Sequence, residues 1–109
     1  MEQALDVLWE EHQGPVFHAA LELWVASRSD PELSRVMYEV EREVAEGIAS
    51  VARDAIGDVA RRPGFIDQLY FALATINGLA LFQITLGDSL DALWVQARQR
   101  LADGLTGAA

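Results

Sequence analysis

The stretch FIDQLYFALATINGLALFQITL, Phe65 to Leu86, is apolar on nearly every side of a helix of this length. Asp67, Gln68, Asn77 and Gln83 interrupt it, whereas a membrane-spanning helix needs about 20 predominantly apolar residues. We therefore expect a helix that is covered on several sides within a soluble protein, and no association with a membrane. The remaining question is what covers it.

The chain has 109 residues, which predicts a single helical domain over residues 1–109. It contains 17 acidic and 8 basic residues, a formal charge of -9, and no basic stripe. This net negative charge repels the phosphates of nucleic acids, so we expect no nucleic-acid binding through this chain alone. The absence of cysteine excludes disulfides and thiolate chemistry. The N-terminal MEQALDVLWEEH is not a secretory signal, which predicts a cytoplasmic location.

The clearest helix start is SDPEL, where Asp30 can cap, Pro31 suits the first turn and Glu32 complements the helix dipole. Apolar residues then recur every three or four positions as far as Ile56, which predicts one long amphipathic helix. Its other face alternates in charge through Arg35, Glu39, Arg42 and Glu46. This pattern is typical of a solvated face rather than a functional acidic patch.

Breaks in the periodicity place the other helices. Gln13 to Pro15 separates a first short helix from a second over Val16 to Arg28, and the segment from Gly57 to Gly64 connects the long helix to the apolar one. Gly87 then predicts a stop, with Asp88 or Ser89 capping a last helix. No alternating strand pattern appears, so the sequence predicts an all-α fold, an antiparallel bundle of about five helices.

The sequence contains no recognisable arrangement of catalytic or metal-binding residues. His12 and His18 lie in no ligand spacing, and there is neither a glycine-rich phosphate loop nor a Ser-His-Asp set. We interpret His12 as a helix-end residue or a donor on a pocket wall. The sequence therefore predicts no enzyme, no metal and no cofactor.

The segment LWEEHQGPVFHAALELWVASRSDPEL, Leu8 to Leu33, resembles the C-terminal regulatory domain of the TetR family of bacterial transcriptional regulators. The similar features are an aromatic residue, Trp9, before the Gly14-Pro15 break, a helix reading ALELWVASR, and the SDPEL start. The helices that follow come in the family's order. The family's N-terminal helix-turn-helix has no counterpart here, so DNA binding is expected only through a domain outside this sequence.

This resemblance implies a ligand-binding domain that dimerises when its last two helices pair with their symmetry mates as a four-helix bundle. The hypothesis is an effector-binding and homodimerisation domain that senses a small apolar or amphipathic ligand. Helix phase selects the candidate ligand-binding residues Trp9, Phe17, Leu21, Trp24, Met37, Val40, Val44, Tyr70, Leu73 and Asn77. The candidate dimer interface consists of Phe71, Ala74, Thr75, Gly78, Phe82, Leu90, Leu93, Trp94, Ala97 and Leu101.

Alternatives remain open at this point. The candidate ligand-binding residues have the same composition as a protein core, so they could simply fill one. A second hypothesis is a stand-alone helical interaction module that forms a heterodimer with a full-length regulator. A third, a helical-bundle enzyme, would require a metal or nucleophile that the sequence does not offer.

Overall fold

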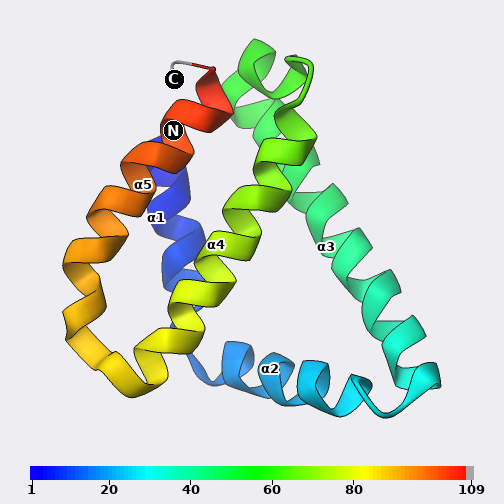
Figure 1. Cartoon of the computed structure of the whole chain (residues 1–109). Helices are drawn as coiled ribbons and strands as arrows, with labels where there is room; N and C mark the ends of the chain where they lie inside the picture. Colours follow the sequence, from blue (N-terminus) through cyan, green and yellow to red (C-terminus); the bar gives the residue numbers. More distant parts are fainter. Residues whose placement is uncertain (108–109) are drawn as a thin grey trace.

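A computed structural model gives the structure of the protein and describes residues 1–107. The all-α prediction is confirmed, because no strand occurs in that range. Figure 1 shows the arrangement of the helices. They are α1 (Glu2–Glu11), α2 (Pro15–Ser27), α3 (Pro31–Ile56), α4 (Phe65–Leu86) and α5 (Asp91–Thr106), with short 3-10 turns η1 (Gly57–Arg61) and η2 (Gly87–Leu90) before α4 and α5.

The boundaries of α3 follow the chemistry read from the sequence. A carboxylate oxygen of Asp30 accepts a hydrogen bond from the backbone N–H of Leu33 at 3.1 Å, and Pro31 occupies the first turn. The helix ends at Gly57, whose φ of 63° is a conformation that side-chain-bearing residues rarely adopt. The prediction that this segment forms one long helix is confirmed.

The start of α5 differs from the expectation. Gly87 ends α4 as predicted, but neither Asp88 nor Ser89 caps α5, which follows Leu90 without a side-chain cap. The hydroxyl of Ser89 donates instead to the carbonyl of Leu86 at 2.6 Å. The reason is that η2 continues the chain as a tighter helix, and such turns commonly satisfy the backbone groups that a helix end leaves free.

The helices α2, α3 and α4 form the sides of a triangle (Figure 1). α3 lies close to α4 near η1 and diverges from it toward the opposite end, where α2 spans the distance between them. α1 and α5 lie on the other side of α4 from α3. The core and the triangle therefore share α4 as a common wall.

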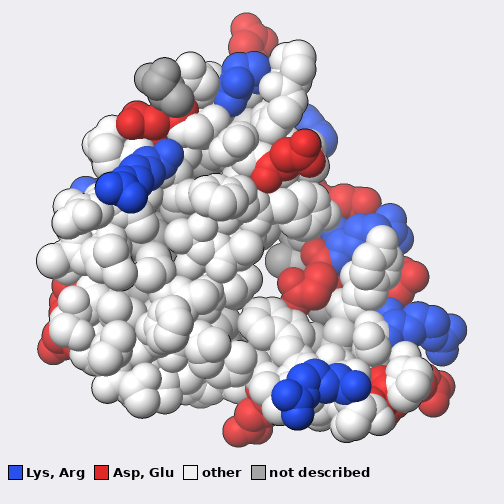
Figure 2. Space-filling view, in the orientation of Figure 1, with Lys and Arg blue, Asp and Glu red and all other residues white. Residues whose placement is uncertain are grey.

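The outer face of α3 carries the charges. Arg42 forms ion pairs with Glu39 at 3.5 Å and with Glu46 at 3.2 Å, and Arg35 lies 3.9 Å from Glu32. The attraction of Glu46, together with Glu39, raises the pKa of Arg42 above its ordinary value. Figure 2 shows positive and negative side chains interspersed along the α3 edge. The predicted solvated face is thus confirmed for these residues.

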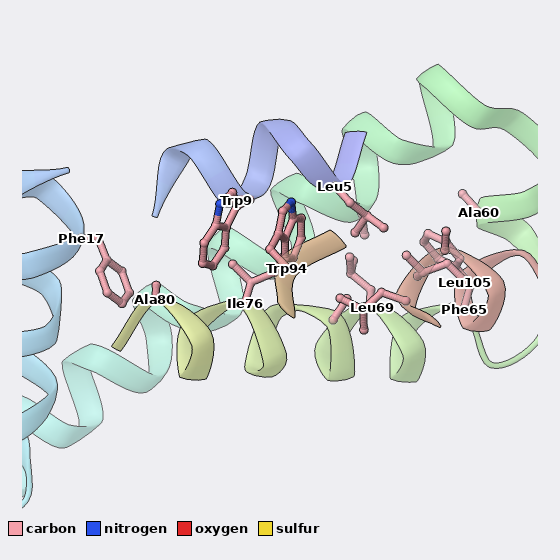
Figure 3. Close-up of a cluster of buried hydrophobic side chains, with 14 residues drawn as sticks. Leu5, Trp9, Phe17, Ala60, Phe65, Leu69, Ile76, Ala80, Trp94 and Leu105 are labelled. Carbon is pink, nitrogen blue, oxygen red and sulfur yellow. The ribbon is translucent and has the colours of Figure 1, made fainter. Parts of the chain in front are cut away.

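The core lies between α1, α4 and α5 (Figure 3). Its centre is an aromatic stack in which the rings of Trp9 and Trp94 are 4.8 Å apart and nearly parallel, at 10°. Ile76 of α4 is fully buried beside them, and Leu5 is 2 % exposed. Burial of such large apolar side chains stabilises the fold by roughly 1.5–3 kcal/mol each.

Candidate functional site

A cavity of about 620 Å³ occupies the centre of the triangle, bounded by α2, α3 and α4; we call it the central cavity. Figure 2 shows its opening between these helices. The volume is in the range of small-molecule sites, which span about 300–1,000 Å³. The structure places at its wall most of the candidate ligand-binding residues, namely Phe17, Trp24, Met37, Val40, Val44, Tyr70, Leu73 and Asn77.

The exposed fractions of the wall residues distinguish a cavity from a packed core. Val40 and Val44 lie on the inner face of α3, yet they are 44 % and 51 % exposed. Protein interiors are packed at crystal-like density, so apolar side chains in a filled core would not retain this much free surface. The inner face of α3 is therefore open to a ligand-sized volume, because α3 diverges from α4.

Two candidate ligand-binding residues lie elsewhere. Trp9 is 9 % exposed and stacks on Trp94 in the core, so its placement at the central cavity was wrong. Leu21 is half-buried on α2 but does not line the central cavity. Helix phase could not separate these positions from the cavity wall, since both belong to apolar faces and only the packing of the helices decides which neighbour each face meets.

The wall of the central cavity carries polar groups from α2, from α3 and from the end of α1. The indole Nε1 of Trp24 donates to Oε1 of Glu41 at 2.7 Å, which connects α2 to α3. Glu11 and His12 at the end of α1 line the same cavity. The Nδ1 of His12 lies 2.6 Å from the carbonyl oxygen of Leu8. A carbonyl only accepts, so Nδ1 carries the proton and Nε2 is the acceptor of the neutral ring.

Glu41 was not among the candidate site residues. Glu41 belongs to a helix segment rich in glutamate, and the alternating charges there predicted that these side chains face solvent. A spacing signal was nevertheless available, because Glu41 lies four residues after Met37 and three before Val44, which are both wall residues. A polar residue at helical spacing within an apolar stripe is the pattern that would have identified it.

Asn77 is the polar residue that α4 contributes. Its side chain lines the central cavity, and its Oδ1 is buried with no hydrogen-bond partner within residues 1–107. An unsatisfied buried polar atom costs about 1–3 kcal/mol, so native proteins rarely keep one without a reason. A ligand that supplied a donor at this position would remove that cost.

A second cavity of about 510 Å³ lies between α1, α3 and α4; we call it the apolar cavity. All of its lining residues, from Met1 and Leu5 to Leu105, lack polar side-chain atoms apart from the weakly polar thioether of Met1. It shares Val44 and Ile48 with the central cavity, so the two lie side by side along the inner face of α3. It can bury apolar surface, but it offers nothing to orient a polar ligand.

The outer side of α4 carries a second feature, an exposed apolar surface that we call the α4 face: Phe71, Thr75, Gly78 and Phe82. Ala74, also expected at the dimer interface, lines the central cavity instead. Phe71 and Phe82 are 62 % and 58 % exposed. The hydroxyl of Thr75 donates to the carbonyl of Phe71 at 2.8 Å, so it needs no further partner. Figure 2 shows that the surface over α4 and α5 is largely free of charge.

The α5 part of the candidate dimer interface requires correction. Leu90, Trp94 and Leu101 are at most 5 % exposed within the protomer, so their side chains are not available to a partner. The apolar stripe of α5 packs against α1 and α4. Leu93 is exposed and Ala97 is half-buried, and these two retain accessible surface beside the α4 face.

The described part of the chain contains no group of three or more His, Asp or Glu residues that could hold a metal ion. Comparison of the chain with protein-family models, with curated proteins and with solved structures finds no match. Any functional conclusion therefore depends on the geometry of the central cavity and of the α4 face.

Proposed function

We propose that this chain is the effector-binding and homodimerisation domain of a TetR-like transcriptional regulator, sensing a small apolar or amphipathic ligand. The central cavity is the observation that carries the proposal, since residues selected by helix phase from three helices meet around one ligand-sized volume. Its wall is mostly apolar, with a few polar side chains. This is the composition typical of sites for small organic ligands.

The dimer part of the proposal rests on the α4 face. An 18-residue window within Phe65–Thr106 is apolar enough to cross a membrane, and 22 % of that window is buried inside the protomer. The other residues of this window are at least partly exposed to solvent on the single chain. In a two-fold dimer, the same surface of a second copy would bury them. Adding a Cβ at Gly78 would meet no atom within 4 Å, so the helix surface is open for close approach there.

The proposed mechanism couples the two features through α4. One side of this helix lines the central cavity at Leu73 and Asn77, and another carries Phe71 and Phe82. A ligand that binds one arrangement of α2, α3 and α4 more tightly shifts the population toward it and moves α4 relative to its partner. DNA-binding domains attached to such a dimer would change their spacing, and half-site spacing is a strict geometric requirement.

The test uses the neutral apolar fluorophore N-phenyl-1-naphthylamine, titrated into the wild-type protein and two matched variants. Leu73→Trp places a larger side chain in the central cavity, whereas Leu81→Trp changes an exposed residue of the same helix outside it. We expect saturable binding at one molecule per protomer, lost in Leu73→Trp and kept in Leu81→Trp. Binding should also raise the midpoint of thermal unfolding of the wild type, because the ligand stabilises only the folded state.

Two results would contradict the proposal. One is the absence of saturable binding in the wild type. The other is equal binding to wild type and Leu73→Trp, which would move the site to the apolar cavity. Circular dichroism of both variants establishes that each retains the helical fold.

A further inference from the structure

The central cavity is lined by acidic side chains and by no arginine or lysine. Its wall contains the carboxylates of Glu11 and Glu41, the imidazole of His12 and the phenol of Tyr70. The protein as a whole carries a formal charge of -9. An anionic ligand would therefore enter a negative field and find no cationic side chain to pair with.

The two carboxylates are available to a ligand. Glu41 accepts from the indole of Trp24 at one oxygen, which holds the carboxylate in place and leaves further lone pairs free. Within the described residues, neither Glu41 nor Glu11 forms an ion pair, in contrast to Glu39 and Glu46 on the outer face. Their charges are thus not compensated by a basic side chain in contact.

Aromatic rings line the same volume. Phe17 and Trp24 meet edge to face with ring centroids 5.9 Å apart, and Tyr70 lies on the α4 side. The negative faces of such rings attract cations, by about 0.5–2 kcal/mol according to how far the cation is desolvated. Carboxylates and aromatic rings around one cavity therefore select the same sign of ligand charge.

The apolar part of the ligand also has a place. Val44 and Ile48 separate the central cavity from the apolar cavity, which has no polar lining apart from the thioether of Met1. A chain or ring that extended from Glu41 toward these two residues would bury apolar surface along α3. Glu41 offers a charged contact, whereas the apolar cavity offers only apolar surface. The two regions therefore match the polar head and the apolar body of an amphiphile.

From this arrangement we propose that the ligand is an amphiphilic cation, an apolar body with a protonated amine or similar head group held by Glu41, while Glu11 adds a second negative charge at the cavity wall. The proposal rests on the central cavity being the effector site, and it specifies the sign of the effector's charge.

The experiment compares three probes that share ten carbon atoms and differ in charge: decylamine, protonated at neutral pH, decanol and decanoate, each below its micelle-forming concentration. Isothermal titration calorimetry on the full chain measures the three dissociation constants. We expect the amine to bind roughly tenfold more tightly than the alcohol, as an ion pair and ring contacts would allow, and the acid to bind most weakly.

Charge-matched variants test the residues. Glu41→Gln keeps an oxygen acceptor for Trp24 and removes the charge, and Glu43→Gln makes the same change on the exposed side of α3. Glu11→Gln and Glu10→Gln form a second such pair at the end of α1. We expect the cavity variants to weaken amine binding roughly fivefold and leave decanol unchanged, and both controls to stay within about twofold of wild type.

The inference is overturned if decanol or decanoate binds as tightly as decylamine, or if the control variants weaken the amine as much as the cavity variants do. If decanol binds the wild type and Leu73→Trp abolishes that binding, but decylamine binds no more tightly than decanol, the proposed ligand-sensing function stands and the proposal of a cationic ligand is rejected. Failure of all three probes to bind contradicts both proposals.

Discussion

The indole of Trp24 and the carboxylate of Glu41 form a hydrogen bond of 2.7 Å that connects two sides of the triangular frame. The residues are 17 positions apart, with the α2–α3 turn between them. α3 diverges from α4, so α2 and α3 form an arm that extends from the core. This bond is one of the few polar contacts that join α2 to α3 within the arm. The same pair lines the central cavity.

Trp24→Phe retains an aromatic ring and removes the indole donor. We expect the free energy of unfolding to fall by about 1 kcal/mol, the usual contribution of one hydrogen bond together with a small loss of buried area. Glu41→Gln should change it by less than half as much, since the amide oxygen still accepts. Urea denaturation followed by circular dichroism measures both, and an unchanged midpoint in Trp24→Phe would show that the bond does not stabilise the frame.

Asn77→Leu removes the unpartnered buried oxygen and keeps the branched shape of the side chain, with the same number of non-hydrogen atoms. We expect the unliganded protein to gain about 1 kcal/mol in stability, because an unsatisfied polar atom is replaced by apolar surface. Affinity for polar-headed ligands should fall at the same time. Gln83→Leu, a partly buried residue of α4 outside the central cavity, is the control, and it should leave ligand affinity as in wild type.

Gly78→Glu tests the α4 face without disturbing the protomer. A Cβ atom at this position meets nothing within 4 Å, and replacing a helix-interior glycine favours the helix by about 0.5–1 kcal/mol. We therefore expect a folded monomer where the wild type is a dimer, measured by size-exclusion chromatography with light scattering. Ala19→Glu adds the same charge to the exposed side of α2 and should remain dimeric. A monomeric wild type, or one that partitions into lipid vesicles, would refute the dimer assignment.

Asp6→Ala tests the polar group that supports the core. The carboxylate of Asp6 accepts from Nε1 of Trp94 at 3.0 Å and from Arg98 at 2.8 Å, which joins α1 to α5. Losing this acceptor leaves two donors without their partner, so the free energy of unfolding should fall by roughly 1–3 kcal/mol. Asp6→Asn keeps an oxygen for the indole and should lose less. Glu10→Ala, an exposed residue of the same helix, should change stability by about 0.5 kcal/mol or less.

Much of the local structure could be predicted from the sequence. Asp30 and Pro31 specify the start of α3 through the groups they offer or lack, and Gly57 and Gly87 end helices because they accept positive φ. The stripe of apolar residues on α3 also predicted which side faces inward. These features are determined by chemistry within a few residues, so no tertiary information was needed.

The partners of each apolar face were decided only by the tertiary structure. The stripe through Leu90, Trp94 and Leu101 showed that one side of α5 is covered, but the cover is α1 and α4 rather than a second subunit. For the same reason, Trp9 was expected at the ligand site but lies in the core. Hydrophobic burial has no direction, so an apolar stripe specifies that a face avoids water and not what it meets. The divergence of α3 from α4, which opens the central cavity and brings Glu41 to its wall, is likewise a property of packing between segments far apart in the chain.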